Sequence, residues 1–253
     1  LIDLTSVASL DVWEKRNDAI HLGARVTYTT VIEQLDEELP ALAIASRTVG
    51  SPQIRNRGTI AGNLVSASPA GDAHPPLLAT GADVVVESMR GERTIPIEEF
   101  YVGVKRCALE PDELIREITV PAARGPQQFA KIGTRNAMVI AVVSFAIALD
   151  TAARTVGTGI GSAAPTPIRA VDAQRYLETV LREGDLWEQP GPLDGSVIDE
   201  FAQQVAAAAS PIDDVRGTAG YRRHSLSVIA GRTLRWAWDE YTRQHLPGIP
   251  HAS

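Results

Sequence analysis

The chain has 253 residues, a formal net charge of -7, 44% hydrophobic and 22% charged residues, which predicts a folded protein with a hydrophobic core in one or two domains. The acidic balance, without any cluster of Lys and Arg, argues against nucleic acid as a partner. The longest apolar stretch, residues 138–149, contains Ser144 and is too short to cross a bilayer, and no signal peptide is recognisable, so we expect a cytoplasmic protein.

The first part of the sequence alternates short strands with helical segments. Residues 19–24 predict a strand, and Thr29 or Thr30 is placed to cap a following helix. Apolar residues then recur at roughly helical spacing over residues 32–44, interrupted by Pro40. These apolar side chains are expected to lie in the core.

The next predicted elements lead to a β-hairpin. Residues 77–78 are expected on a short helical turn. Strands are predicted at residues 82–87 and 93–97, and the Arg-Gly-Glu sequence between them is typical of a hairpin turn. A further strand is predicted at residues 113–120, where the following proline ends it.

The pattern changes after residues 121–128, which are rich in Ala, Pro and Gly and form the best candidate linker. Beyond it, three antiparallel strands are predicted at 129–133, 139–150 and 156–162, and three helices at 171–181, 197–209 and 219–241. Strands followed by helices within one segment predict an α+β domain with the helices packed on one face of the sheet. The fold class is therefore α+β.

One glycine-containing segment, residues 55–63, has the composition of an anion site. Gly58 and Gly62 permit positive φ angles and close backbone approach, so that main-chain N–H groups can face a bound anion. Residues 39–71 contain three arginines and no Asp or Glu, although the chain as a whole is acidic. A phosphate or dinucleotide site and a simple tight loop with solvated arginines both fit this composition.

The cysteine and histidine content limits the chemistry of the chain. Cys107 is the single cysteine, which excludes an internal disulfide and a thiolate-bound iron–sulfur cluster on this sequence. The five histidines form no closely spaced pair of the kind that binds zinc. We expect His74 to lie in a solvent-facing loop, and we predict no metal site. Metal–sulfur redox chemistry is assigned to other chains.

The anion-site segment also carries a resemblance to a known family. Residues 53–63, Gln-Ile-Arg-Asn-Arg-Gly-Thr-Ile-Ala-Gly-Asn, and residues 67–72, Ala-Ser-Pro-Ala-Gly-Asp, resemble the signature of molybdenum hydroxylase FAD subunits. That family includes the medium subunit of aerobic carbon monoxide dehydrogenase and the flavin domain of xanthine dehydrogenase. The family usually has Gly where this chain has Ala61.

The C-terminal part resembles the same family. Residues 164–169 and 213–223 match its C-terminal domain. The resemblance implies an FAD-binding PCMH-type α/β domain at residues 1–122 and a small α+β domain with an antiparallel sheet and helices at 128–241. Residues 242–253 are expected to form a tail.

The resemblance implies two loops that hold FAD between two subdomains. In relatives, the first loop is of Ala-Gly-Gly-Thr type and holds the pyrophosphate. This sequence contains no such loop, so we expect the natural protein to extend upstream of Leu1, with most of the N-terminal subdomain missing here. The second loop is present and implies backbone and hydroxyl contacts to FAD from Thr59, Ile60, Ala61, Gly62 and Asn63.

Four other residues match cofactor positions of the family. Asp72 matches a carboxylate that bonds cofactor hydroxyls, and Lys131 matches a lysine near the flavin, where a cation favours the reduced, anionic form. Val49 and Ile115 match apolar positions that contact the cofactor. Taken as isolated residues, Lys131 also fits an exposed strand position, and the two apolar residues also fit ordinary core. No side chain is assigned a catalytic role.

The implied function is that of an oxidoreductase subunit. FAD links one-electron and two-electron carriers, which suits the junction between iron–sulfur clusters and a two-electron acceptor. By resemblance, a molybdopterin subunit oxidises the substrate and a [2Fe-2S] iron–sulfur subunit relays electrons to this flavin. The flavin passes them to NAD, oxygen or a quinone. Relatives commonly pair their heterotrimers, so a dimer of heterotrimers is expected.

Three other interpretations remain open at this stage. A structural subunit with the same fold that has lost FAD is compatible with Ala61 and with the missing first loop. A stand-alone vanillyl-alcohol-oxidase-type flavin oxidase would need a covalent attachment residue and a large cap domain, for which the sequence offers no obvious case. A Rossmann-type nicotinamide dehydrogenase is the least favoured, because the βαβ fingerprint is absent.

Overall fold

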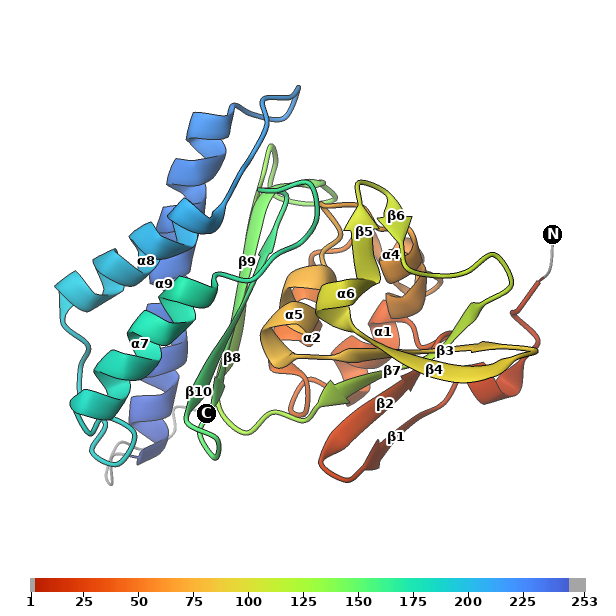
Figure 1. Cartoon of the computed structure of the whole chain (residues 1–253), viewed down its shortest axis with the longest axis horizontal. Helices are drawn as coiled ribbons and strands as arrows, with labels where there is room; N and C mark the ends of the chain where they lie inside the picture. Colours follow the sequence, from red (N-terminus) through yellow and green to blue (C-terminus); the bar gives the residue numbers. More distant parts are fainter. Residues whose placement is uncertain (1–2, 246–253) are drawn as a thin grey trace.

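The computed structural model describes residues 3–245, which form an N-terminal unit and a C-terminal unit packed side by side (Figure 1). The N-terminal unit contains a five-stranded sheet in which every neighbouring pair is antiparallel. In sheet order the strands are β1 (Trp13–Arg16), β2 (Ala19–Gly23), β7 (Leu114–Pro121), β3 (Asp83–Ser88) and β4 (Gly91–Pro96). The strands and the hairpin predicted from the sequence of this region are present, but the predicted position of the turn is wrong: Gly91 and Glu92 already belong to β4, and Ile97 begins helix α6 (Ile97–Phe100).

Short helices cover one face of this sheet. They are α1 (Tyr28–Gln34), α2 (Pro40–Arg47), α3 (Pro52–Arg55), α4 (Ile60–Val65), α5 (His74–Thr80) and α6 (Ile97–Phe100), with a 3-10 turn, η1, at Ala8–Leu10. A small hairpin of β5 (Tyr101–Gly103) and β6 (Arg106–Cys107) follows α6. The helical turn predicted at residues 77–78 lies within α5.

Two expectations about the first helical region are wrong. The apolar spacing over residues 32–44 belongs to two helices, because Pro40 is the first residue of α2. Proline lacks a backbone N–H and is tolerated at a helix start, so it divides the segment. The N-cap of α1 is Thr27 and not Thr29 or Thr30, since the Thr27 hydroxyl accepts the N–H of Thr30 at 3.2 Å.

The C-terminal unit contains a three-stranded antiparallel sheet and three longer helices. The strands are β8 (Gln127–Gly133), β9 (Ala141–Asp150) and β10 (Thr155–Gly161), with β9 in the centre. The helices are α7 (Val171–Glu183), α8 (Gly195–Ala208) and α9 (Ala219–His245). All six predicted elements are present.

Helix α9 is longer than predicted. It continues through His245, so the first four residues of the expected tail at 242–253 belong to the helix, and residues 246–253 lie outside the described residues. Within residues 3–245, no helix combines the length and the apolar character that crossing a membrane requires.

The three-stranded sheet is buried on both faces, because it lies between helices of the two units (Figure 1). On one face Phe145, Ile147 and Leu149 pack in the core formed with α7, α8 and α9. On the other face Ala146 and Ala148 pack with small residues of α2. The sequence of a strand that is buried on both faces is a nearly continuous run of apolar residues, and the sequence of β9 has this character. The face of this sheet that meets the N-terminal unit positions the candidate site.

Arg222 joins several segments near the top of this sheet. Its side chain is buried, and its guanidinium donates hydrogen bonds to the carbonyl oxygens of Val142 at 2.6 Å and Ser162 at 2.8 Å. It also pairs with Asp214 at 2.5 Å in the loop before α9. The N–H of Ser162 in turn bonds the carbonyl oxygen of Pro69 at 2.7 Å, which links this region to the N-terminal unit.

Glycine residues permit the close contact between β10 and α5. A Cβ atom at Gly157 would lie 1.8 Å from the carbonyl oxygen of Ala79, and one at Gly159 would lie 2.0 Å from that of Pro75. Because backbone atoms cannot move aside as a flexible side chain can, Gly157→Ala is expected to lower the free energy of unfolding by about 1–3 kcal/mol or more. Chemical denaturation of the purified complex measures this loss.

The control for this prediction is Gly220→Ala at the start of α9, where an added Cβ has no atom within 4 Å. Alanine favours a helix over glycine by about 1 kcal/mol, so this variant should be no less stable than the wild type. Equal stability of the Gly157→Ala variant and the wild type would contradict the close contact between β10 and α5.

Candidate cofactor site

The second loop of the sequence signature forms the start of helix α4. Thr59 is the N-cap residue, and its hydroxyl accepts the N–H of Gly62 at 3.0 Å. The side chains of Ile60 and Ala61 point into the core of the N-terminal unit and are 1% and 5% exposed. Only the backbone of these two residues therefore remains for a ligand, while Thr59 and Asn63 retain partly exposed side chains.

The two glycines in this segment do not use the positive φ angles that glycine permits. Neither Gly58 nor Gly62 has a positive φ angle. Both N–H groups are used within the chain, since Gly58 donates to the carbonyl of Ile54 at 2.6 Å and Gly62 donates to Thr59. A Cβ at Gly58 would lie 3.0 Å from the carbonyl oxygen of Ile54 and 3.2 Å from the ring of Tyr28, so a larger residue would require these neighbours to shift by a few tenths of an ångström.

Asn63 connects α4 to the segment that carries Asp72. The side-chain oxygen of Asn63 accepts the N–H of Ala73 at 3.2 Å. A Cβ at Gly71 would lie 2.9 Å from that same oxygen and 2.2 Å from Nε2 of His74. The backbone at Gly71 is therefore pressed between two polar side chains, which fixes the position of the next residue, Asp72.

Asp72 and Lys131 form a buried ion pair across the two units. Lys131 Nζ lies 2.7 Å from Asp72 Oδ2, and the two side chains are 7% and 10% exposed. Lys131 Nζ also donates to the carbonyl oxygen of Thr48 at 3.1 Å, at the end of α2. Lys131 belongs to β8, and its side chain points to the sheet face that meets the N-terminal unit. The expectation of an exposed strand lysine is thus wrong.

The protonation of Asp72 reflects two opposing influences. Burial raises the pKa of Asp72 above its ordinary value, whereas the charge and the hydrogen bond of Lys131 lower it. The nearby phenol of Tyr28 is also affected, since burial and the negative charge of Asp72 raise its pKa. The two residues are therefore close enough to interact, and the ion pair keeps charge on a carboxylate in a buried position.

One oxygen of Asp72 provides a test of whether a hydroxyl-bearing cofactor fits here. Lys131 occupies Oδ2, but Oδ1 is buried and has no hydrogen-bond partner among the described residues. A buried carboxylate oxygen without a donor is unfavourable, so a ligand hydroxyl is the natural partner. The ribityl and ribose hydroxyls of FAD meet this requirement, and the site therefore fits the cofactor that the sequence implied.

His74 is buried and does not face solvent, in contrast to the expectation from the sequence. Its side chain is fully buried, and its Nδ1 accepts the hydroxyl of Tyr101 at 2.5 Å. Burial lowers the pKa of His74 to about 3, only partly offset by the backbone of Ser68. His74 is thus neutral at physiological pH and packs edge-on against Tyr101, beneath the segment that carries Asp72.

The other two predicted residues are part of the core of the N-terminal unit. Ile115 on β7 is 5% exposed, and Val49 packs against the same core in the connection between α2 and α3. Sequence reasoning missed Thr48, whose hydroxyl lies 3.5 Å from Asp72 Oδ2. Its position next to Val49 was the available signal. No sequence pattern pointed to Tyr28.

A cavity of about 510 Å³ adjoins the ion pair. We call it the arginine cavity, and Lys131 forms part of its wall. It is lined by Ile44, Arg47, Thr48, Gly50, Ser51, Pro52, Arg55, Phe129, Lys131, Gly133, Arg135, Asn136, Ala137, Met138 and Val139. No acidic residue occurs among these described lining residues, although the chain is acidic overall.

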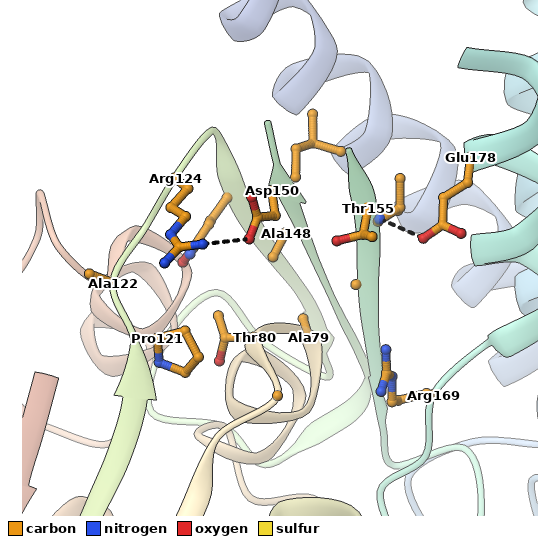
Figure 2. A pocket seen from close by; sticks show the side chains of 15 residues that line it. Ala79, Thr80, Pro121, Ala122, Arg124, Ala148, Asp150, Thr155, Arg169 and Glu178 are labelled. Carbon is orange, nitrogen blue, oxygen red and sulfur yellow. Dashed lines mark hydrogen bonds and ion pairs between the residues drawn. The ribbon is translucent and has the colours of Figure 1, made fainter. Parts of the chain in front are cut away.

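A second cavity, of about 290 Å³, lies at the connection between the two units and contains none of the predicted site residues (Figure 2). Its charged groups are largely engaged with one another and with the backbone. Arg124 lies 3.9 Å from Asp150, and Glu178 accepts the N–H of Val156 at 2.8 Å. Mixed and partnered charges suit an anionic ligand less well than the arginine cavity does, since no acidic residue occurs among the described residues that line the arginine cavity.

Comparison with known proteins identifies the class to which this fold and site belong. A family model described as the FAD binding domain in molybdopterin dehydrogenase matches residues 1–123. A second, described as the CO dehydrogenase flavoprotein C-terminal domain, matches residues 128–237. Both matches agree with the order of the two units along the chain.

Individual relatives match over most of their length. The nicotine 6-hydroxylase medium subunit of Paenarthrobacter nicotinovorans is 30% identical, over 92% of this chain and 80% of that protein. The carbon monoxide dehydrogenase medium chain of Hydrogenophaga pseudoflava is 30% identical, over 94% of this chain and 81% of that protein. The solved structure of carbon monoxide dehydrogenase from the latter organism superposes with a TM-score of 0.81 at 27% identity, over 92% of this chain and 79% of that one.

These similarities confirm the resemblance and the fold class inferred from the sequence. The chain belongs to the family of FAD-binding medium subunits of molybdenum hydroxylase-type complexes. It is accordingly an oxidoreductase subunit whose cofactor is FAD.

Proposed function

We propose that this chain holds FAD at the junction of its two units and passes electrons from a [2Fe-2S] partner to a two-electron acceptor. The observation that carries the proposal is the buried Lys131–Asp72 pair, with its unpartnered Asp72 Oδ1 beside the second loop. We assign the site to Val49, Thr59, Ile60, Ala61, Gly62, Asn63, Asp72, Ile115 and Lys131. When bound, FAD supplies the exchange between one-electron and two-electron transfer.

The residues of the chain bind, orient and shield the cofactor and take no covalent part. Asp72 Oδ1 accepts a hydrogen bond from a cofactor hydroxyl, and the backbone of Ile60 and Ala61 is all that these residues present to the ligand. Lys131 places a positive charge in a water-poor region, which favours negative charge on the bound group. Buried Ile115 and partly buried Val49 supply apolar surface and limit the access of water.

The electron route requires partner chains. Cys107 is the one cysteine of the sequence, too few for the thiolate ligands of an iron–sulfur cluster on these residues. We propose an iron–sulfur subunit as the electron donor and a molybdopterin subunit as the site of substrate oxidation, with two heterotrimers paired. The medium-subunit names of the relatives support such an assembly.

We also propose that the chain divides into an FAD-binding domain at residues 1–122 and a second domain at 128–241. Two large hydrophobic cores, one in each unit, support this division. The residues between β7 and β8 contain neither helix nor strand. The Lys131–Asp72 pair joins the two domains at the proposed site.

The natively purified complex tests the proposal. We expect its visible absorption spectrum to show flavin and its native mass spectrum to show an iron–sulfur chain and a molybdopterin chain. Asp72→Asn should weaken FAD binding about 10- to 100-fold, the effect of losing a hydrogen bond to a charged group. FAD content after dialysis, per mole of this chain, measures the change.

Asp199→Asn on the exposed side of α8 serves as the matched control and should leave FAD content unchanged. A complex with both partners but no flavin would favour a structural subunit that has lost FAD. Flavin in a chain that purifies alone and turns over a substrate would favour a stand-alone oxidase. Unchanged FAD affinity in the Asp72→Asn variant would contradict the assigned site.

A further inference from the structure

The buried pair of His74 and Tyr101 is not among the residues assigned to the cofactor site, but it adjoins the segment that carries Asp72. His74 is the first residue of α5, and Tyr101 is the first residue of β5. The His74 side chain is fully buried, and Tyr101 is 8% exposed. A buried pair of this kind keeps one geometry, because a rearrangement would leave polar atoms without partners.

The hydrogen bond between the two side chains determines which imidazole nitrogen carries the proton. The Tyr101 hydroxyl lies 2.5 Å from Nδ1 of His74 and has no other acceptor among the described residues, so the hydroxyl donates and Nδ1 accepts. Burial lowers the pKa of His74 to about 3, so the imidazole is neutral and its single proton is on Nε2. Nε2 makes no complete hydrogen bond within the described part of the chain.

The protonated nitrogen faces the turn that precedes Asp72. A Cβ atom at Gly71 would lie 2.2 Å from Nε2 of His74 and 2.5 Å from Cδ2, so the imidazole edge lies against the Gly71 backbone. The N–H of Gly71 closes the turn by donating to the carbonyl oxygen of Ser68 at 2.9 Å. The backbone of Ser68 also raises the pKa of His74, although burial has the larger effect. The imidazole therefore supports this turn from the inside.

Asn63 of the second loop supports the turn from another side. The same Cβ at Gly71 would lie 2.9 Å from Asn63 Oδ1, which accepts the N–H of Ala73 at 3.2 Å. The amide oxygen of Asn63 is thus used within the chain, and its Nδ2 group remains for the cofactor. The imidazole and the amide together leave room only for a glycine at position 71.

Other contacts hold the earlier part of the segment and not its end. The carbonyl oxygen of Ala67 accepts the N–H of Lys105 at 3.1 Å, and that of Pro69 accepts the N–H of Ser162 at 2.7 Å. Neither bond involves the residue directly before Asp72. The course of the backbone into Asp72 therefore depends on the contact with the imidazole.

We propose that His74, held in place by Tyr101, is a positioning residue for cofactor binding, because it sets the turn from which Asp72 presents Oδ1 to FAD. The inference rests on the proposed function, in which Asp72 is the group that contacts the cofactor. His74 is fully buried and acts through Asp72. Its contribution to FAD binding should therefore disappear when the Asp72 carboxylate is removed.

His74→Leu removes both ring nitrogens and keeps an apolar side chain of moderate size. The Kd of FAD, measured by fluorescence titration of the flavin-depleted complex, should rise about 3- to 10-fold, the effect of one lost hydrogen bond. In the Asp72→Asn background the same substitution should have little further effect, because the two residues act on one contact.

Tyr101→Phe separates positioning from stability. In the His74→Leu variant the Tyr101 hydroxyl is buried without a partner, whereas the variant His74→Leu/Tyr101→Phe retains no polar atom of the pair. The double variant should recover part of the free energy of unfolding, but its Kd for FAD should stay as high as that of His74→Leu. His74→Gln should restore part of the affinity, since an amide both accepts and donates.

Thr233→Val is the matched control. Thr233 is fully buried in α9, where its hydroxyl donates to the carbonyl oxygen of Ile229 at 2.9 Å. The substitution removes a buried hydrogen bond from the core of the second unit, as His74→Leu does in the first. It should leave the Kd of FAD unchanged.

The results distinguish a failure of this inference from a failure of the proposed function. If Asp72→Asn weakens FAD binding and His74→Leu does not, the inference is wrong and the proposed function stands. Equal effects of His74→Leu in the wild-type and Asp72→Asn backgrounds would also overturn it, as would recovery of affinity together with stability in the double variant. Unchanged affinity in the Asp72→Asn variant would contradict the proposed function and the inference with it.

Discussion

Replacement of Lys131 by Met is expected to lower the free energy of unfolding by about 3–5 kcal/mol, the usual effect of removing one partner from a buried ion pair. Met preserves much of the side-chain volume of Lys, so the loss of stability is caused by removal of the charge. Asp72 would keep a buried negative charge, and Thr48 would be its one remaining side-chain donor among the described residues. Denaturant titration of the purified complex measures the loss, and FAD content should fall in parallel.

The double variant Lys131→Met/Asp72→Asn separates charge from packing. It should recover part of the stability lost in the single variant, because no buried charge then remains. If the free energy of unfolding of the Lys131→Met variant lay within about 1 kcal/mol of the wild-type value, the pair would contribute no more than a surface ion pair does. That result would contradict this prediction.

The pH dependence of the Lys131→Met variant follows from the same carboxylate. Burial already raises the pKa of Asp72, and removal of Lys131 takes away the main opposing influence. The folded variant therefore binds a proton at a higher pH than the unfolded chain does. Between the raised folded pKa and the ordinary value of 3.8, the stability of the variant should increase as pH falls, relative to that of the Lys131→Met/Asp72→Asn variant.

Arg222→Met is the second substitution with a large expected effect, again about 3–5 kcal/mol. It removes the donors for the carbonyl oxygens of Val142 and Ser162 and the buried partner of Asp214. The contact of Ser162 with Pro69 connects this region to the segment that carries Asp72. Faster release of FAD should therefore accompany the lower stability. The rate of release is measured by stopped-flow dilution of the holoenzyme.

Arg216→Met provides an unusually close control, because Arg216 pairs with the same carboxylate, Asp214, at 3.1 Å. Its side chain is 40% exposed, compared with 4% for Arg222. Exposed pairs typically contribute about 0–1 kcal/mol, so this variant should be nearly as stable as the wild type. Similar losses of stability in the two variants would show that burial does not govern the contribution of Arg222 to stability.

The elements of this fold were predictable where they depend on local pattern. The uninterrupted apolar run of β9 and the helical periodicity of α9 identified both elements from neighbouring residues alone. Errors arose where one residue changed the local geometry. Pro40 begins helix α2 and does not interrupt a longer helix. The N-cap of α1 is Thr27, which precedes the two threonines predicted from the sequence.

The site was predictable only in part, because its main interaction is not local. Family resemblance selected both Asp72 and Lys131, but no pattern along the chain reveals that residues 59 positions apart form a buried ion pair. The burial of His74 depends on Tyr101, which lies 27 positions further along. Likewise, Thr48 contacts Asp72 through its hydroxyl and Lys131 through its carbonyl oxygen, and the second of these groups is one that every residue possesses.

The ion pair between the units also limits how relatives of this chain can recombine. The matches to the two family models meet between residues 123 and 128, which is the obvious breakpoint for a chimera of two family members. Such a breakpoint takes Asp72 from one parent and Lys131 from the other. Strand β8, although it hydrogen-bonds to β9 of the second unit, supplies a charge on which the first unit depends. A crossover placed after Gly133 would transfer both charged partners together and preserve the pair.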